Sequence, residues 1–357
     1  YLIMWKSSRL IVRLINFLNL PKMHKKMATK DKLFELLSSN ADEFISGQII
    51  ADELKLSRNS IWKGITSLKK DGYIIESKPH IGYRLAGESN LLSKEIIIKD
   101  LRVPCTVEVH NTVTSTNDMA KKKAMSHKPI VLIANRQSNG RGRLGRSFES
   151  PGGTGLYLTI ALKPGFSLEK SLYVTMAAAV SVCRAIEKVC DRNPQINGKN
   201  PQIKWVNDIF IENKKVCGIL TEAQTNFETG QIDSLIIGIG VNCFPGNLPN
   251  ELKEIAGSIS EKTGSFSRNR LAAEIINETL KSLDRIEDKS FLTEYKSRCF
   301  ILGHEIKVHP QYDKSGIPAK ALDIAEDGGL IVEYIDGTKK GETETLHTGE
   351  ISIRLTR

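Results

Sequence analysis

Apolar residues between positions 29 and 70 recur at spacings of three and four, the pattern of helices that bury one face. Ser46 and Ser57 stand where the second and third stretches begin, and serine is a favoured residue for capping a helix N-terminus. The segments YIIESK and IGYRL follow, joined by Pro79-His80, and predict a β-hairpin. The pattern predicts three helices and a hairpin, with these side chains turned inward: Leu33, Leu36, Leu37, Ile49, Ile50, Leu54, Ile61, Ile65 and Leu68.

Three short helices followed by a hairpin have the order of a winged helix-turn-helix, which we place at residues 27–88. The third helix of that fold lies in the major groove of DNA. Here it carries several cations against Asp71 alone, and arginine and asparagine are able to read base edges. A module that binds a protein instead of DNA is the alternative. The DNA interpretation predicts a palindromic operator bound by a homodimer, with contacts from Arg58, Asn59, Ser60 and Lys63.

Residues 89–299 alternate strand-like and helical segments. Helical spacing marks residues 172–189 and 270–286, and Glu212-Asn213 forms a predicted hairpin turn. Strands grouped around a few helices predict an α+β domain with a mixed sheet. The domain has no G-x-x-x-x-G-K-[ST] loop and no G-x-G-x-x-G that opens a helix after a strand, so any nucleotide must bind by another device. The predicted strands are IVLIANRQ, GLYLTIAL, QIKWVNDIFI, KVCGILTEA and SLIIGIGVN.

The two ends of the chain differ in character. Residues 300–357 alternate apolar and polar positions around Asp-Gly pairs and predict a small β-barrel. Residues 1–26 contain arginine and lysine but no acidic residue, which is also compatible with an amphipathic presequence. The clean helix start at Thr29, just after Met27, favours a non-domain upstream segment instead, so we exclude residues 1–26 from the fold interpretation.

Charge and cysteine content narrow the class of protein. The net charge is +10, but residues 1–26 carry +6 of it, so the remaining +4 does not by itself indicate nucleic-acid binding. The six cysteines form no C-x-x-C pair, and no H-E-x-x-H occurs. A zinc site or a disulfide framework is therefore not expected, and reduced thiols favour the cytoplasm. No stretch approaches the ~20 apolar residues of a membrane span.

The segment GRGRLGR, residues 140–146, packs three arginines and three glycines into seven positions. Glycine raises the entropy cost of ordering a helix or strand, so this composition is typical of a loop. Two interpretations are open: a flexible basic linker, or a loop that orders around an anion. The second predicts a loop that is open without ligand and closes over it.

The middle domain resembles the biotin protein ligases, and with the winged helix in front it resembles the bifunctional biotin ligase and biotin-operon repressor family of bacteria. The resemblance runs from about residue 28 to the end and implies that the C-terminal barrel is SH3-like. It rests on an ordered set of motifs: STN at 115–117, Gln137, GRGRLGRSF at 140–148, SPGG with GLYL at 150–158, KWVND at 204–208, VCGIL at 216–220 and GIGVN at 238–242.

The family resemblance implies an adenylate-forming reaction. Biotin and ATP, with Mg²⁺, give biotinyl-5′-adenylate and pyrophosphate, and biotin then passes to a lysine of the biotin carboxyl carrier protein of acetyl-CoA carboxylase. Two anions must approach each other in the first step, so charge neutralisation matters more than a protein nucleophile. Asn207 or Asp208 is expected to help hold ATP or Mg²⁺, and no dedicated metal ligand is assigned. The resemblance implies catalytic roles for Lys204, Arg141 and Arg143, and a biotin or adenylate site of Ser115, Thr116, Asn117, Gln137, Arg141, Gly142, Arg143 and Lys204.

Two positions depart from the family pattern: Val206 replaces a usual proline, and Phe148 replaces a common tryptophan. Neither change removes a charged group, so we expect an effect on affinity and not on activity. Two other functions stay open at this point. One is a lipoate-type ligase of the same architecture, and the other is a metabolite-sensing DNA-binding repressor without ligase activity.

Overall fold

The computed structural model describes residues 29–40, 43–70, 75–85, 91–123, 128–164, 171–194, 196–225, 232–246, 249–309, 316–347 and 350–353. The chain divides into two compact units, one ending at Gly87 and the other beginning at Glu88. The predicted upstream segment 1–26 and Asp71 lie outside the described residues. The predicted boundary near residue 299 falls inside the second unit, so a separate C-terminal domain stays a prediction.

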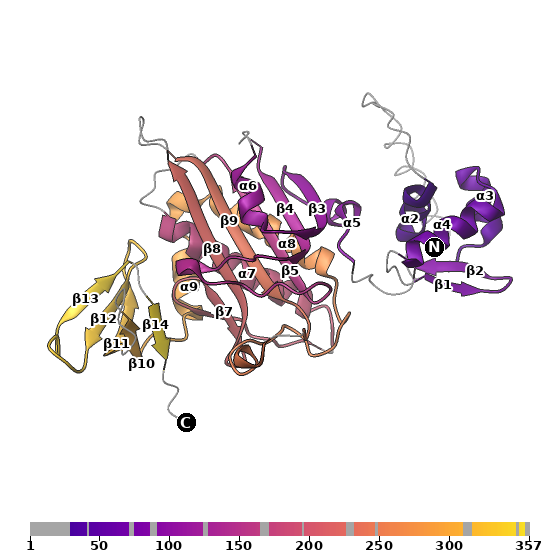
Figure 1. Cartoon of the computed structure of the whole chain (residues 1–357). Helices are drawn as coiled ribbons and strands as arrows, with labels where there is room; N and C mark the ends of the chain where they lie inside the picture. The colour runs from indigo at the N-terminus through magenta and orange to yellow at the C-terminus, as the bar shows by residue number, and fades with distance from the viewer. Residues whose placement is uncertain are drawn as a thin grey trace, which may run out of the picture. The chain divides into compact units, whose positions relative to one another are not determined.

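Between residues 29 and 85, where the structure describes most of the first unit, three helices and a two-stranded antiparallel sheet are present (Figure 1). Both predicted caps are present, because Ser46 Oγ accepts a hydrogen bond from Ile49 N and Ser57 Oγ accepts one from Ser60 N, each at 3.2 Å. The hairpin pairs Lys78 with Gly82, as the Pro79-His80 turn predicted. The elements are α2 (Thr29–Ser39), α3 (Gly47–Leu54), α4 (Arg58–Lys70), β1 (Ile75–Lys78) and β2 (Gly82–Leu85).

One predicted core position in this unit is wrong. Ile49 is 54% exposed, whereas the adjacent Ile50 is fully buried. The Ser46 cap starts α3 so that Ile50 points inward, and adjacent residues of a helix lie about 100° apart around its axis, which turns Ile49 outward. Leu54 is only half-buried, while the predicted core residues of α2 and α4 are buried.

The second unit contains a mixed sheet, as predicted, and the described strands of this sheet follow the order β3-β4-β5-β9-β8-β7-β6. The pair β3·β4 is parallel and the other pairs are antiparallel. Glu212 and Asn213 both have positive φ in the tight turn between β7 and β8. The strands are β3 (Thr106–Val113), β4 (Ile130–Gln137), β5 (Gly155–Leu162), β6 (Gln202–Lys204), β7 (Asp208–Ile211), β8 (Lys214–Thr225) and β9 (Ile232–Asn242).

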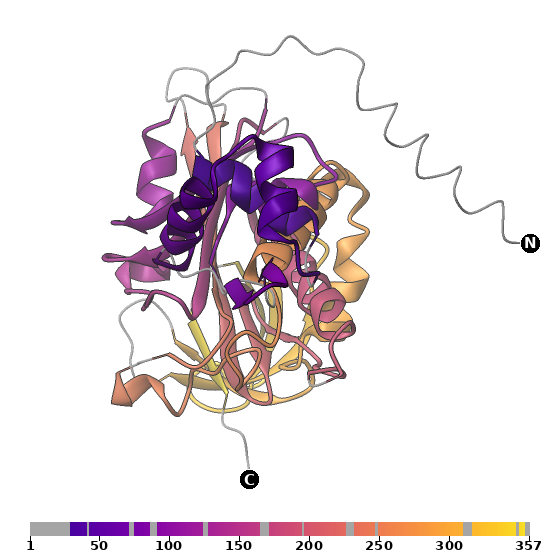
Figure 2. The same cartoon turned by 90° about the vertical axis from the view of Figure 1, so that its right-hand side faces the viewer.

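Helices cover this sheet unequally. The two long helices, α7 (Ser171–Cys190) and α8 (Arg268–Leu283), pack together on one face of the sheet, where nearly every side chain of α7 is buried (Figures 1 and 2). The short α6 packs against β4, β5 and β9 on the other face, over a small cluster of Ala120, Leu132, Ala161 and Ile236. α6 covers only part of that second face, and the cavity described below lies over another part of it. The helices are α5 (Lys94–Lys99), α6 (Thr116–Lys121), α7 (Ser171–Cys190), α8 (Arg268–Leu283) and α9 (Phe291–Arg298). Among the described residues, no helix has the length and apolar character needed to cross a membrane.

The predicted strand QIKWVNDIFI is in fact two strands. β6 ends at Lys204, which pairs with Asp208 at the start of β7, and Trp205, Val206 and Asn207 form the turn between them. The turn is held by hydrogen bonds that the local sequence does not reveal. Trp205 Nε1 donates to Gly328 O at 3.1 Å, and the hydroxyl of Tyr295 donates to Val206 O at the same distance.

The C-terminal region forms an antiparallel sheet with strand order β13-β12-β11-β10-β14, drawn in yellow tones in Figure 1. Gly328 and Gly337 follow aspartates and have positive φ, so the predicted Asp-Gly turns are present. Over the described residues the sheet is open, because β13 and β14 form its two edges and do not pair with each other. The closed barrel is therefore not seen. The strands are β10 (Glu305–His309), β11 (Ile317–Ile324), β12 (Leu330–Tyr334), β13 (Thr343–Leu346) and β14 (Glu350–Ile353).

Candidate active site

Strand alternation gives the large sheet one apolar face and one open face. Alternate residues of β8 and β9, such as Ile219, Ile237 and Ile239, pack into the core beneath α7 and α8. The residues between them point to the opposite face, and several are glycines: Gly218 lies opposite Gly240, and Gly238 lies opposite Leu220. The missing side chains leave room above the sheet, and a cavity lies there.

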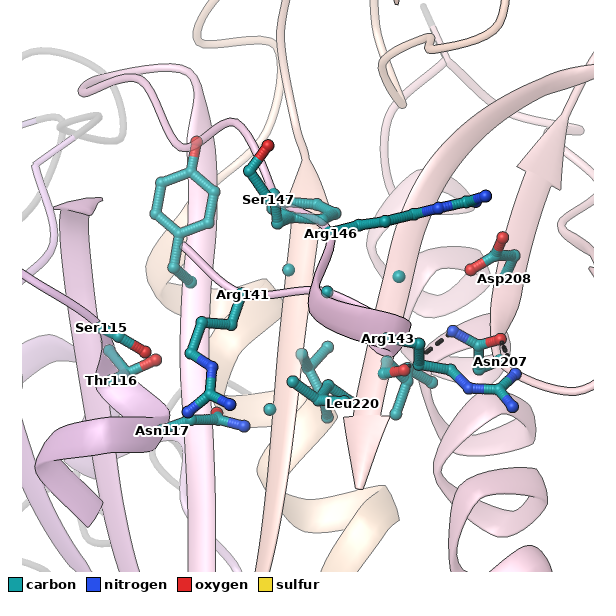
Figure 3. Close-up of a pocket in the computed structure, with 18 of the residues that line it drawn as sticks. Ser115, Thr116, Asn117, Arg141, Arg143, Arg146, Ser147, Asn207, Asp208 and Leu220 are labelled. Carbon is teal, nitrogen blue, oxygen red and sulfur yellow. Dashed lines mark hydrogen bonds between the residues drawn. The ribbon is translucent and has the colours of Figure 1, made fainter. Parts of the chain in front are cut away.

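This cavity brings together every residue predicted for the ligase site. The lining residues come from the start of α6, the end of β4, the 140–148 loop and the turn after β6, which are far apart in the sequence. Figure 3 shows Ser115, Thr116 and Asn117 at one end of the cavity and Asn207 with Asp208 at the other. The predicted residues that line it are Ser115, Thr116, Asn117, Gln137, Arg141, Gly142, Arg143 and Lys204.

The end formed by α6 is polar and buried. Ser115, Thr116 and Asn117 are each at most 5% exposed. Ser115 also caps α6, because its Oγ accepts a hydrogen bond from Asp118 N, so the same residue begins the helix and lines the cavity. Gln137 Oε1 accepts from Thr116 N at 2.8 Å, and Gln137 Nε2 donates to Ser150 Oγ at 3.0 Å. Such a cluster suits a ligand group with hydrogen-bonding atoms at fixed positions.

The Gly-Arg segment is a folded loop and not an open linker. Arg141 pairs with Ser147, Gly142 N donates to Arg146 O at 2.7 Å, and Phe148 N donates to Gly140 O at 2.9 Å. Leu144 and Gly145 turn the chain at the tip with positive φ. The loop lies over the open face of the sheet and forms one wall of the cavity (Figure 3). That the loop is open without ligand and closes over it stays a prediction.

The arginines of the loop point in different directions. Arg141 turns toward Asn117, where its Nη1 lies 2.6 Å from Asp118 Oδ1 and its Nη2 lies 3.5 Å from Glu222 Oε1. The hydrogen bond to Asp118 and the charge of Glu222 raise the pKa of Arg141 above its ordinary value. Two carboxylates thus balance this guanidinium, which anchors the loop to α6 and β8.

The other end of the cavity is cationic. Arg143 Nη1 donates to Asn207 Oδ1 at 3.0 Å, and Asn207 Nδ2 donates to Ile219 O at 2.9 Å. Lys204 lines the cavity from the end of β6, and Lys215 Nζ lies 2.7 Å from Asp208 Oδ1. Asp208 is the one acidic residue among the described residues that line the cavity. Positive charge therefore exceeds negative charge at this end.

A second, more apolar cavity continues from the cationic end. The two cavities share Lys204, Asp208 and Lys215 together with residues 146–148. Beyond them the second cavity is lined by Phe210 and Phe300, whose ring centroids are 5.4 Å apart, and by Leu252 and Ile255. A ligand with a polar end, a charged middle and a flat apolar end would match, in that order, the polar end of the first cavity, its cationic end and the second cavity.

Phe148, which the sequence marked as a replacement of tryptophan, lies across Gly218 and Gly240, and a Cβ at Gly240 would come 2.6 Å from its Cε1 atom. Sequence reasoning missed other residues of the site. Thr159, fully buried on β5, contacts both Thr116 and Asn117, and Glu222 contacts Asn117. The glycines in VCGIL and GIGVN were visible in the sequence, but only the strand register shows that they form one floor. No sequence motif marked Lys215 or Glu222 as a residue of the site.

In the first unit, the predicted DNA contacts lie on α4. Arg58, Asn59 and Lys63 are exposed, and Ser60 is half-buried with its Oγ 2.9 Å from Ser57 Oγ. Arg58 Nη2 donates to Gln48 Oε1 at 3.1 Å, which ties this side chain to α3. Trp62 on the same helix is 59% exposed. The helix therefore presents a cationic, partly aromatic surface.

No group of three or more histidine, cysteine, aspartate or glutamate side chains is arranged to hold a metal ion within the described parts of the chain. Five of the six cysteines are buried and Cys105 is half-buried, all as free thiols. Burial raises the pKa of the Cys243 thiol to about 12, and the Cys217 thiol is shifted in the same direction.

Comparison with known proteins agrees with this architecture. Residues 109–242 match the Biotin/lipoate A/B protein ligase family, and residues 29–84 match an HTH domain. The crystal structure of the biotin protein ligase from Aquifex aeolicus in complex with biotin and ATP is 28% identical, with a TM-score of 0.56, and the match covers 70% of this chain and 98% of that one. The fold and site thus define a protein ligase of the biotin/lipoate class joined to a helix-turn-helix domain.

Two curated relatives narrow the class. The bifunctional ligase/repressor BirA of Bacillus subtilis (strain 168) is 34% identical over 321 residues, which cover 86% of this chain and 95% of the relative. BirA of Escherichia coli (strain K12) is 28% identical over 327 residues, covering 90% and 96%. The chain belongs to the family of bifunctional ligase/repressor proteins.

Proposed function

We propose that this protein is a biotin–[acetyl-CoA-carboxylase] ligase that also represses transcription of biotin genes in response to biotin. The observation that carries the proposal is the single cavity lined by the STN triplet, Gln137, the Gly-Arg loop and Lys204. The family relationship and the helix-turn-helix unit support the two halves of the activity. The absence of disulfide pairing among the cysteines supports a cytoplasmic location.

In this proposal the polar end of the cavity holds the ureido ring of biotin. The ring offers one carbonyl acceptor and N–H donors, and the buried Ser115, Thr116 and Asn117 supply hydrogen-bonding atoms of both kinds. A ligand without the ureido group forms fewer hydrogen bonds with these side chains, and each bond that is lost costs about 0.5–1.5 kcal/mol net. This cost favours biotin over lipoate. The valeryl chain of biotin then runs along the sheet floor toward the cationic end.

The cationic end supports the adenylation step. A carboxylate oxygen of biotin attacks the α-phosphorus of ATP, the bond from that phosphorus to the bridging oxygen breaks, and pyrophosphate leaves. Lys204 and Arg143 lower the repulsion between the carboxylate and the α-phosphate and orient both groups. The acceptor lysine, as a free amine, then attacks the acyl carbon of the adenylate. The bond between that carbon and the bridging phosphate oxygen breaks, AMP leaves, and the nitrogen loses a proton to give the amide.

The second cavity is the proposed adenine side of the ATP site, since Phe210, Phe300, Leu252 and Ile255 offer apolar surface for a flat base. Mg²⁺ would enter with ATP, because magnesium is commonly held by substrate phosphates with one or two carboxylates. Asp208 is the carboxylate placed to contribute, and no three-residue protein cage is present among the described residues. Mg²⁺ bound there would neutralise phosphate charge.

For the first unit, we propose binding to a palindromic operator as a homodimer. One recognition helix covers only a short half-site, so a dimer is needed for a specific sequence. The exposed Arg58, Asn59 and Lys63, with Ser60 beside them, are the proposed contacts on α4. The acceptor in the ligase reaction is the biotin carboxyl carrier protein of acetyl-CoA carboxylase. We also propose that residues 300–357 are the SH3-like domain of the family, with domain boundaries near residues 27, 88 and 299.

The test is ligation by the purified full chain. With biotin, ATP, Mg²⁺ and an acceptor domain, we expect biotin-dependent pyrophosphate exchange and transfer of labelled biotin to one lysine of the acceptor. Lipoate in place of biotin should give little product. Preference for lipoate would identify a lipoate-type ligase, and loss of all adenylation with retained DNA binding would identify a sensor without ligase activity.

A further inference from the structure

Glu222 of β8 lies beside the polar end of the cavity but is not part of its lining. Glu222 Oε2 accepts a hydrogen bond from Asn117 Nδ2 at 2.9 Å, and Glu222 Oε1 accepts one from Lys121 Nζ at 2.7 Å. Arg141 Nη2 approaches the same Oε1 at 3.5 Å. Beside these two cations the side chain is a carboxylate, which only accepts hydrogen bonds.

The carboxylate fixes the orientation of the Asn117 amide. If the amide were rotated by 180°, its carbonyl oxygen would face Glu222, and two acceptors would meet with no proton between them. Nδ2 must therefore face Glu222, and Oδ1 must face the other way. On that side Oδ1 lies 2.7 Å from the hydroxyl of Thr159.

The orientation of the Asn117 amide also determines which hydroxyl groups of Thr159 and Thr116 donate a proton. Thr159 Oγ1 lies within hydrogen-bond distance of both Asn117 Oδ1 and, at 2.8 Å, Thr116 Oγ1. A hydroxyl has one proton, and the amide oxygen can only accept, so Thr159 donates to Asn117. The contact with Thr116 then needs the proton of Thr116. Gln137 Oε1, 3.1 Å from Thr116 Oγ1, still receives the Thr116 backbone N–H at 2.8 Å.

We propose that Glu222 is a positioning residue that sets the direction of this chain, from Thr116 through Thr159 and Asn117 to the carboxylate. Because the hydroxyl proton of Thr116 is donated to Thr159, the Thr116 oxygen can only accept a hydrogen bond from a ligand in the cavity. The ligand group that it recognises is an N–H donor. This inference rests on the proposed function, in which the donor is a ureido N–H of biotin.

The same contacts distinguish this role from that of a simple anchor. Asp118 also contacts Arg141, and its Oδ1 lies 3.8 Å from Lys121 Nζ, but the hydrogen bonds of the Asn117 side chain go to Glu222 and Thr159 and not to Asp118. Neutralising Asp118 therefore weakens the charge cluster and leaves the hydrogen-bond chain intact. Neutralising Glu222 does both. The pair Glu222→Gln and Asp118→Asn separates the two effects.

The experiment measures steady-state kinetics of adenylation by the full chain, with biotin and with desthiobiotin, which keeps the ureido group. Glu222→Gln can present either a donor or an acceptor to Asn117, so the direction of the chain is lost. We expect the KM for both ligands to rise about tenfold, while kcat and the KM for ATP stay within about twofold. Asp118→Asn weakens the Arg141 anchor but keeps the hydrogen-bond chain, so it should raise the biotin KM by clearly less than Glu222→Gln does.

A double-mutant cycle completes the test. In the Asn117→Ala background the chain is already broken, so adding Glu222→Gln should not raise the biotin KM further. Additive increases would overturn the proposal, as would an equal effect of Asp118→Asn, which would make Glu222 only a loop anchor. Thermal unfolding of each variant checks that the fold is retained. If the wild-type chain shows no biotin-dependent pyrophosphate exchange, the proposed function is wrong. If the wild-type chain exchanges normally and Glu222→Gln has the wild-type biotin KM, only the inference about Glu222 is wrong.

Discussion

The ring of Phe148 lies over Gly240 at the centre of the open sheet face, so closely that a single added carbon would meet it. A Cβ built at Gly240 would be 2.6 Å from Cε1 and 2.7 Å from Cζ of Phe148. Phe148 also meets Tyr157 edge to face, with ring centroids 6.4 Å apart. Phe148 therefore gives the open sheet face an aromatic surface, and the glycine floor sets how deeply the ring sits.

Gly240→Ala should displace Phe148 and distort the cavity. Overpacking of this kind costs about 1–3 kcal/mol, so we expect a lower unfolding midpoint in urea together with a higher KM for biotin. Gly47→Ala is the matched control, because a Cβ there meets only Tyr83 at 3.9 Å. Wild-type stability and wild-type kinetics in Gly240→Ala would show that the ring adjusts without cost.

Lys204→Ala should slow adenylation without unfolding the protein. In the proposed mechanism the side chain brings positive charge to the point where the biotin carboxylate and the α-phosphate approach, and removing one such group commonly costs ~10²–10³ in rate. Pyrophosphate exchange with biotin and ATP measures the effect. Lys281→Ala, which removes an exposed lysine from the last turn of α8, should exchange at the wild-type rate. A near-normal rate in Lys204→Ala would remove the lysine from the adenylation step.

Arg58→Ala should weaken DNA binding and leave ligation unchanged. If Arg58 reads a base edge, its loss costs about 1–3 kcal/mol of specific binding. A gel-shift titration on operator and unrelated DNA measures both affinities, with the exposed Lys32→Ala on α2 as control. An equal loss on all sequences would make Arg58 a phosphate contact. Unchanged affinity would favour a protein-binding module.

Arg102→Met should destabilise the second unit in a pH-dependent way. Arg102 donates two hydrogen bonds to the buried Glu274, at 3.0 and 2.7 Å, and these bonds lower the pKa of that carboxyl. A lowered pKa in the folded state gives stability above the ordinary glutamate pKa, and this stability is lost as the pH falls through the folded value. Urea unfolding should therefore show a large difference from wild type at pH 7 that shrinks toward pH 3. A difference that does not change with pH would contradict this assignment.

The sequence predicted elements where local pattern and local chemistry agree. Ser46 and Ser57 capped the helices as expected, and the Glu212-Asn213 turn formed between two strands. The predictions from the sequence were wrong where a residue far along the chain determines the local conformation. The break of QIKWVNDIFI at Trp205 depends on Gly328 and Tyr295, which lie far along the chain.

The candidate site shows the same division. The motifs identified residues that the fold brings into one cavity, but they did not separate the environments of the two arginines. Arg141 is balanced by Asp118 and Glu222, whereas Arg143 reaches the Lys204 turn through Asn207. These differences come from strand register and loop conformation, which no short motif encodes.

The hydrogen bond between Arg143 and Asn207 gives the loop a second attachment, on the cationic side of the cavity. Arg143 Nη1 donates to Asn207 Oδ1, and Asn207 is itself held by Ile219 O, so the tip of the loop is tied to the turn that follows Lys204. Arg141 holds the other side of the loop on α6. In the proposed function the adenylate is a reactive mixed anhydride, and we expect the loop to exclude water and delay its release.

Arg143→Gly removes this attachment and leaves the Arg141 anchor in place. We expect the variant to form biotinyl-adenylate but to release it early, because the loop opens more readily on the cationic side. The dissociation rate of the adenylate and the labelling of lysines on a non-acceptor protein such as albumin should both rise. Arg136→Ala, an exposed arginine of β4 outside the cavity lining, is the control and should match wild type in both assays. If Arg143→Gly keeps the wild-type dissociation rate and labels only the acceptor, the loop does not retain the adenylate through Arg143, and the charge of this side chain serves the adenylation step alone.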